Sequence, residues 1–174
     1  IIISSDKDNI PLVQQNTEAL GNAWFIRNIN WVDNADEELT SLSRIDPKTT
    51  VSINKKHRSY VDSVDFLLTD KVELSSYSPN RLVYKVKSEK SNFIVFSEIY
   101  YPKGWIAYVD GVQTTHFPVN YILRGLVIPK GGSEIVFEFK PKSFFVSNKI
   151  AFLVSGLLIL TGFLLFFRLF LYLK

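Results

Sequence analysis

A single arginine stands among apolar residues in the stretch ILRGLVI at residues 122–128. Strand alternation places Arg124 on the face expected to be buried, which it shares with Ile122, Leu126 and Ile128. A buried guanidinium needs a partner, and Asp110 and Glu98 are the candidate carboxylates. Arg124 is therefore either an internal strut, held by an ion pair or loop carbonyls, or a cleft residue that holds a phosphate or sugar oxygen.

Three aromatic residues near Arg124 in the sequence offer flat faces on which a sugar ring could stack. They are Trp105, Tyr108 and Tyr121. Together with Arg124 they form the set of ligand-binding candidates. Core packing is the simpler interpretation of any single ring, and ligand stacking is the alternative that the sequence leaves open.

The sequence contains no recognisable catalytic or metal-binding pattern. His57 and His116 lie in dissimilar contexts, and the absence of cysteine excludes disulfides and thiolate metal sites. Nucleophile-elbow, phosphate-loop and dinucleotide-binding motifs are also absent. The acidic residues of 33–38 are explained by the N-terminus of a helix. We therefore predict no catalytic residue, no metal site and no cofactor in this chain.

Composition limits the classes of partner. The formal net charge is +3, and basic and acidic residues are nearly balanced across residues 1–149. A nucleic-acid-binding protein usually carries a basic face, so we expect no nucleic-acid partner. The 174 residues include no methionine, which indicates a piece of a longer or processed protein.

Residues 81–140 predict an antiparallel β-sandwich. Strand-like stretches with turns between them lie at 81–88, 93–101, 105–117, 122–128 and 133–140. The stretch 93–101 has no clear polar face, which favours a central strand. Asp110-Gly111 predicts a type I′ hairpin turn, and the Gly-Gly pair at 131–132 is expected to turn the chain back for the next strand.

The upstream half predicts one strand and a short helix. Residues 23–32 are expected to form a single strand. Asn34 followed by Glu37 predicts a helix start with a capping box, and Pro47 is expected to end that helix. Residues 54–70 are ambiguous and are expected to be partly loop.

The C-terminal end predicts a transmembrane helix. Residues 150–167 lack any charge and span roughly 27 Å as a helix, and continuation to Leu173 makes the segment long enough for the ~30 Å hydrocarbon core. Small residues near one helical face favour packing against other helices; they are Ala151, Ser155 and Gly162. Flanking charges do not fix the orientation, because that rule weakens beside a large folded domain.

The predicted organisation is thus mainly β. Residues 1–148 form a β-rich domain whose sandwich core lies at about 71–141, and residues 149–174 form the membrane helix with a short tail.

Two motifs in a fixed order resemble a known family. YYPKGWIAYVDG at 100–111 precedes VNYILRGLVIPKGGSEIVFEFKP at 119–141, and the membrane helix follows. This order resembles the C-terminal end of the YfhO-type bacterial membrane proteins. ALGNAWFIRNINWVDNADEEL at 19–39 is similar to the preceding segment of that family, so the resemblance covers roughly residues 19–170.

The resemblance implies a large polytopic protein with a glycosyltransferase-C-like membrane core. Such enzymes take sugars from polyprenyl-phosphate carriers, and family members are associated with adding sugars to cell-envelope polymers such as teichoic acids. It further implies a bacterial cytoplasmic membrane, an extracytoplasmic β domain, and a cytoplasmic tail holding Arg168 and Lys174. The implied partners are the lipid bilayer, other transmembrane helices of the same protein, and a polyprenyl-phosphate sugar or envelope polymer.

The same resemblance gives no catalytic residue. Catalytic acids of such enzymes lie in loops between early membrane helices, which this chain does not include. The sequence also fits a single-pass envelope protein whose β domain binds carbohydrate or a protein partner without catalysis.

Overall fold

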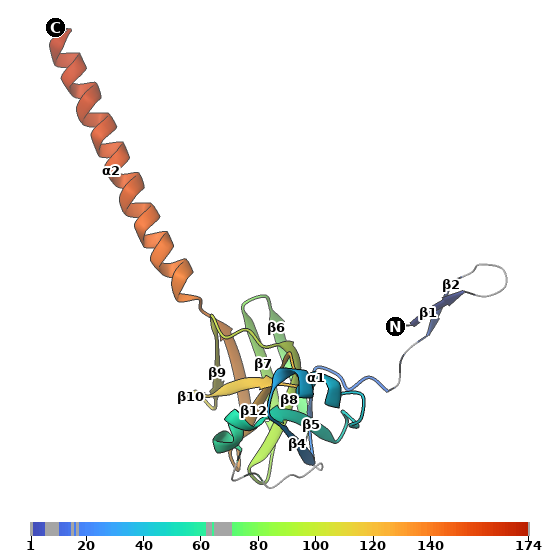
Figure 1. The fold of residues 1–174 in the computed structure, drawn as a ribbon. Coiled ribbons are helices and arrows are strands. Elements are labelled where there is room, and N and C mark those ends of the chain that lie inside the picture. The colour runs from blue at the N-terminus through green and yellow to red at the C-terminus, as the bar shows by residue number, and fades with distance from the viewer. Residues whose placement is uncertain are drawn as a thin grey trace.

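The computed structural model describes residues 2–5, 11–14, 16, 18–61, 64 and 71–173. Two antiparallel sheets pack face to face as a β-sandwich, and a long C-terminal helix projects away from them (Figure 1). The expected fold class is confirmed: a mainly β sandwich, a short upstream helix and a C-terminal apolar helix.

The elements are, in chain order, β1 (Ile2–Ser5), β2 (Pro11–Gln14), β3 (Ala23–Phe25), β4 (Asn28–Val32), α1 (Ala35–Ser41), β5 (Thr50–Asn54), the 3₁₀ helix η1 (Lys55–Tyr60), β6 (Lys71–Ser78), β7 (Arg81–Lys87), β8 (Asn92–Ile99), β9 (Trp105–Val109), β10 (Val112–Thr114), β11 (His116–Val119), β12 (Leu123–Ile128), β13 (Glu134–Phe139) and α2 (Lys142–Tyr172). The larger sheet has the order β10-β9-β13-β7-β6, and the second has the order β11-β12-β8-β3. Strands β4 and β5 pair in parallel, and β1 and β2 form a separate antiparallel pair.

The four-stranded sheet is buried on both faces. One face packs against the five-stranded sheet, with Ile94 and Phe96 of β8 in that core. The other face packs against β5 and its neighbours, with Phe93 and Val95 of β8 in the second core. Residues 92–96 of β8 are consequently all buried, which explains why this strand shows no polar face and confirms its central position.

Two connections differ from the expectations. The single strand expected at 23–32 is two strands, because the chain breaks at Ile26–Arg27 and β3 and β4 enter different sheets. The turn at 129–133 does not return the chain beside β12. It carries the chain to the opposite sheet, where β13 pairs with β7 and β9.

Helix α1 begins as its capping residues require. The Asn34 side chain accepts from the Glu37 N–H at 2.9 Å, and the Glu37 carboxylate accepts from the Asp33 N–H at 2.9 Å. This confirms the expected start at Asn34. The helix ends at Ser41, well before Pro47, so that proline does not terminate it.

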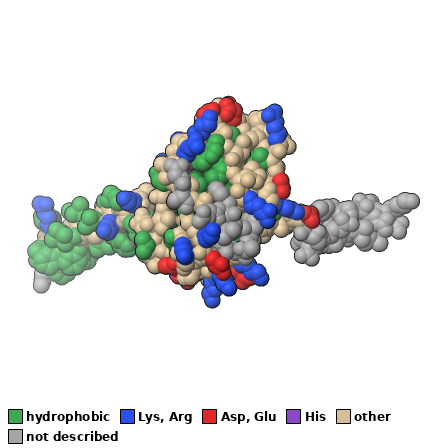
Figure 2. Space-filling view, turned by 90° about the horizontal axis from the view of Figure 1, so that it is seen from below, with side chains coloured by type: hydrophobic (Ala, Val, Ile, Leu, Met, Phe, Trp, Pro, Cys, Tyr) green, Lys and Arg blue, Asp and Glu red, His purple; other side chains and the backbone are tan. Residues whose placement is uncertain are grey.

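Helix α2 has 31 residues, none of them buried, and an 18-residue stretch within it has a mean hydropathy of 2.6, so it is long and apolar enough to cross a membrane. It starts at Lys142, directly after Pro141, and thus ahead of the apolar run. On the face drawn in Figure 2, hydrophobic side chains dominate α2, whereas basic and acidic side chains are mixed over the β domain.

Candidate functional site

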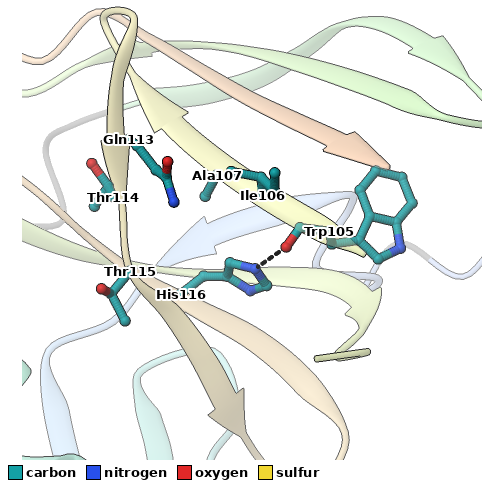
Figure 3. Close-up of a pocket in the computed structure, with 7 residues that line it drawn as sticks. All are labelled: Trp105, Ile106, Ala107, Gln113, Thr114, Thr115 and His116. Atoms are coloured by element: carbon teal, nitrogen blue, oxygen red, sulfur yellow. Dashed lines mark hydrogen bonds between the residues drawn. The ribbon is translucent and has the colours of Figure 1, made fainter. Parts of the chain in front are cut away.

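A hollow opens at the edge of the sandwich where the chain crosses between sheets. Strand β10 pairs with β9 in the larger sheet, and β11 then pairs with β12 in the smaller one, so the chain leaves its first partner at Thr115. This crossover hollow has a volume of about 330 Å³ and is lined by Trp105, Ile106, Ala107, Gln113, Thr114, Thr115 and His116. Figure 3 shows the side chains of Gln113 and His116 on the side of the β10–β11 segment that faces β9, with Trp105 at the start of that strand.

His116 connects two of the strands that line this hollow, β11 and β9. Its Nε2 lies 3.1 Å from the Trp105 carbonyl oxygen, so Nε2 carries the proton in the neutral ring and donates to that oxygen (Figure 3). The ring also packs edge-on against Phe137 and Tyr100, with centroids 5.5 Å and 5.4 Å away. The imidazole therefore fixes the position of β11 against β9.

Arg124 lies beneath Trp105. Its guanidinium carbon is 4.3 Å from the Trp105 ring centroid and 5.1 Å from that of Phe137, and the residue is only 2% exposed. The Nε donates to the Ile99 carbonyl oxygen at 3.1 Å. Cation–π contacts and one backbone carbonyl thus hold the guanidinium. This arrangement matches the structural interpretation of Arg124 in which carbonyl groups, and not an ion pair, hold the side chain.

The expected ion pair of Arg124 is not formed. The Asp110 carboxylate instead accepts from the Ser133 hydroxyl at 2.7 Å and from the Glu134 N–H at 2.9 Å, so it caps the start of β13. Glu98 forms no ion pair with Arg124, although its negative charge opposes the effect of burial, which lowers the pKa of Arg124. The buried charge of the guanidinium is accordingly stabilised by aromatic rings more than by a carboxylate.

Several polar atoms in this cluster have no hydrogen-bond partner among the described residues. They are the Arg124 Nη1, the Tyr84 hydroxyl oxygen and the His116 Nδ1. Tyr84 is fully buried, and burial raises its pKa well above the usual range, with the charge of Glu98 adding to this. The polar atoms beneath Trp105 are therefore costly to bury and have unused capacity for hydrogen bonds.

The four expected ligand residues do not share one site. Trp105 and Arg124 are in contact. Tyr108 lies on the outer face of β9 with Ile106, because Ala107 and Val109 point into the core. Tyr121 lies in the turn between β11 and β12, where its N–H donates to the Glu38 carboxylate at 3.1 Å.

Glu38 lies in the first turn of helix α1, as expected, and also makes a contact that its sequence position did not indicate. It is 6% exposed and accepts a hydrogen bond from the Tyr121 backbone, and burial raises its pKa. Glu38 thus braces the β11–β12 turn against α1.

A second hollow lies where the β domain meets α2. This junction hollow has a volume of about 460 Å³ and is lined by Pro102, Lys103, Gly104, Trp105, Ile106, Gln113, Lys140, Pro141, Lys142 and Ser143. It shares Trp105, Ile106 and Gln113 with the crossover hollow. Sequence reasoning missed both hollows, although the lysines immediately before the apolar run were a visible signal of the second.

The half-buried His116 predicts a pH dependence of stability. Burial lowers its pKa below the usual 6.5, the Trp105 carbonyl opposes this shift, and the charge of Arg124 adds to it. Because the unfolded state then binds a proton before the folded state does, stability is greatest above pH 6.5 and falls as the pH drops below it.

We expect the wild-type chain in detergent to lose more free energy of unfolding than His116→Gln between about pH 7.5 and about pH 5.5, measured by urea titration. The pKa of His57 is lowered too, but His57 is present in both chains and its effect cancels in the comparison. Equal losses in the two chains would contradict this account of His116.

Comparison with known protein families identifies the chain. A family model described as "Bacterial membrane protein YfhO" matches residues 48–168, well over half of the sequence. This chain belongs to the YfhO family. The match to the YfhO family runs from just before β5 into α2 and so includes both hollows. It makes the chain part of a membrane protein, with α2 as the candidate span. No curated protein and no solved structure matches the chain.

Proposed function

We propose that this chain is the C-terminal accessory domain and last membrane helix of a polytopic bacterial glycosyltransferase. The enzyme takes sugars from a polyprenyl-phosphate carrier and adds them to cell-envelope glycopolymers. Residues 1–148 then lie on the extracytoplasmic side of the cytoplasmic membrane, and residues 149–174 form the span and a short cytoplasmic tail. Membership of the YfhO family supports this proposal, because the matched region joins the β domain to the membrane helix.

The crossover hollow is the observation that supports a carbohydrate ligand. Gln113, Thr114 and Thr115 line the hollow with an amide and two hydroxyls, and none of these side chains is charged. Gln113 and Thr114 lie on opposite faces of β10, because Gln113 pairs with Tyr108 and Thr114 with Ala107. Amide and hydroxyl groups both donate and accept hydrogen bonds, as sugar hydroxyls do. In this proposal the hollow holds the acceptor polymer, while the catalytic acids belong to membrane loops elsewhere in the protein.

Helix α2 supports the polytopic arrangement. The small residues Ala151, Ser155 and Gly162 let a neighbouring helix approach closely, and a Cβ at Gly162 would meet no atom within 4 Å. The other membrane helices of the same protein are the proposed partners of this face.

The test uses the full-length protein in membranes supplied with a radiolabelled polyprenyl-phosphate sugar and an envelope polymer. We expect protein-dependent incorporation of label into the polymer. The double variant Gln113→Leu/Thr115→Val should lower incorporation about tenfold, because two hydrogen bonds of about 0.7 kcal/mol each are lost. Thr40→Val on helix α1 is the matched control and should leave incorporation unchanged.

Absence of any protein-dependent incorporation would overturn the proposal of sugar transfer. If the polymer nevertheless bound to the wild-type protein and not to the double variant, the β domain would be a non-catalytic carbohydrate-binding module, which is the alternative that the same hollow supports.

A further inference from the structure

The walls of the junction hollow are fixed by specific backbone contacts. The Lys140 N–H donates to the Gly104 carbonyl at 2.7 Å, which ties the segment leaving β13 to the loop before β9. Gly104 has a φ of 135°, and a Cβ there would lie 2.6 Å from the Phe139 ring. Only glycine permits this close approach, so the wall formed by residues 102–104 is held against the end of β13.

The lining of this hollow is positively charged. Lys103, Lys140 and Lys142 line it, and no acidic residue does. Lys140 is paired with Glu138, whereas Lys103 and Lys142 have no ion-pair partner among the described residues. Helix α2 also starts here without a side-chain cap, so its first N–H groups add partial positive charge. An anionic group is the complementary ligand.

The position of the hollow along α2 identifies the source of that anion. Lys149 precedes the uncharged run that begins at residue 150, which marks the near edge of the hydrocarbon core. Lys142 lies seven residues earlier, roughly 10 Å along a helix. The headgroup layer on each side of a bilayer is about 5–8 Å thick, so the lysines of the hollow lie at the level of lipid phosphates or just beyond. The exposed rings of Phe144 and Phe145 lie between these two levels, at the boundary of the hydrocarbon core.

We propose that the junction hollow binds the phosphate of an anionic phospholipid headgroup at the membrane surface. The bound lipid holds the β domain against the bilayer and keeps the crossover hollow, which shares Trp105 with it, close to the headgroup layer. This inference does not depend on sugar transfer, because it concerns the bulk lipid around α2.

The test compares the full 174-residue chain in nanodiscs of phosphatidylcholine with the same chain in equal parts phosphatidylcholine and phosphatidylglycerol. We expect phosphatidylglycerol to raise the melting temperature of the β domain by about 4 °C, because a ligand that binds only the folded state stabilises it. The variant Lys103→Gln/Lys140→Gln/Lys142→Gln should lose this rise.

The matched control removes the same amount of charge at the opposite end of the sandwich. Two turns lie at the end of the sandwich that is remote from α2, and the Gly131 N–H donates a hydrogen bond from one turn to the Ser88 carbonyl of the other. The control lysines lie in or beside these turns; they are Lys87, Lys90 and Lys130. Their replacement by glutamine should preserve the rise. Retention of the rise in the junction variant, or its equal loss in both variants, would overturn the proposal.

Soluble anions distinguish the source of the phosphate. Inorganic phosphate or a soluble poly(glycerol phosphate), added to the phosphatidylcholine nanodiscs, should not reproduce the effect. If either of them raised the melting temperature as much as phosphatidylglycerol does, the hollow would bind a soluble phosphate or a polymer, and the lipid proposal would be wrong.

Discussion

Replacement of Arg124 by alanine is expected to lower the free energy of unfolding of the β domain by about 3 kcal/mol. The change removes the guanidinium contacts with Trp105 and Phe137, removes the hydrogen bond to the Ile99 carbonyl, and leaves a cavity at a residue that is 2% exposed. Urea unfolding followed by tryptophan fluorescence measures the loss, because Trp105 reports directly on this cluster.

Arg124→Met separates the packing role of the side chain from its charge. Methionine keeps most of the volume against the two rings and removes a buried charge that has no ion pair within the described part of the chain, so we expect a loss of only about 1 kcal/mol. An alanine variant with wild-type stability would refute the strut interpretation. If such a variant had also lost carbohydrate binding, Arg124 would be a ligand contact.

Gly125→Ala is expected to destabilise the domain by about 3 kcal/mol through overpacking. A Cβ at this position would lie 2.5 Å from Cζ of Phe93 and 2.7 Å from Cγ1 of Val119, and both neighbours are buried in the second core. The groups that approach Gly125 most closely are thus two side chains and no backbone atom. Gly156→Ala in α2 is the control, since nothing lies within 4 Å of its Cβ position.

A second substitution tests the cause of the Gly125→Ala effect. Phe93→Leu removes the ring atom that the new methyl group would meet, so the double variant should be more stable than the sum of the two single losses indicates. Strict additivity of the two losses would show that the methyl group is accommodated in another way.

Local signals in the sequence predicted local structure correctly. Asp110 and Gly111 have φ values of 48° and 80°, as a type I′ turn requires, and they join β9 to β10. Alternation also placed Arg124 with Leu126 and Ile128 on the buried face. These features depend on neighbouring residues alone, which is why the sequence was sufficient for them.

Features that depend on distant parts of the chain could not be predicted. Ile122 was expected to be buried but is 48% exposed, because a register shift at Leu123–Arg124 interrupts the alternation. The partner of Glu38 lies in a turn 83 residues later in the sequence. The crossing from β12 to β13 and the junction hollow likewise arise from tertiary packing, which hydrophobic periodicity does not record.

The position of β13 has a consequence for biosynthesis. This strand is the last of the sandwich in chain order, yet it lies in the interior of its sheet between β7 and β9. The hairpins β6–β7 and β9–β10 therefore keep unpaired edges until the ribosome has made the residues directly before α2. Only two residues separate β13 from that helix. The residues that close the sandwich and those that enter the bilayer are thus synthesised in immediate succession, and a pause in translation before β13 leaves edges exposed that favour aggregation.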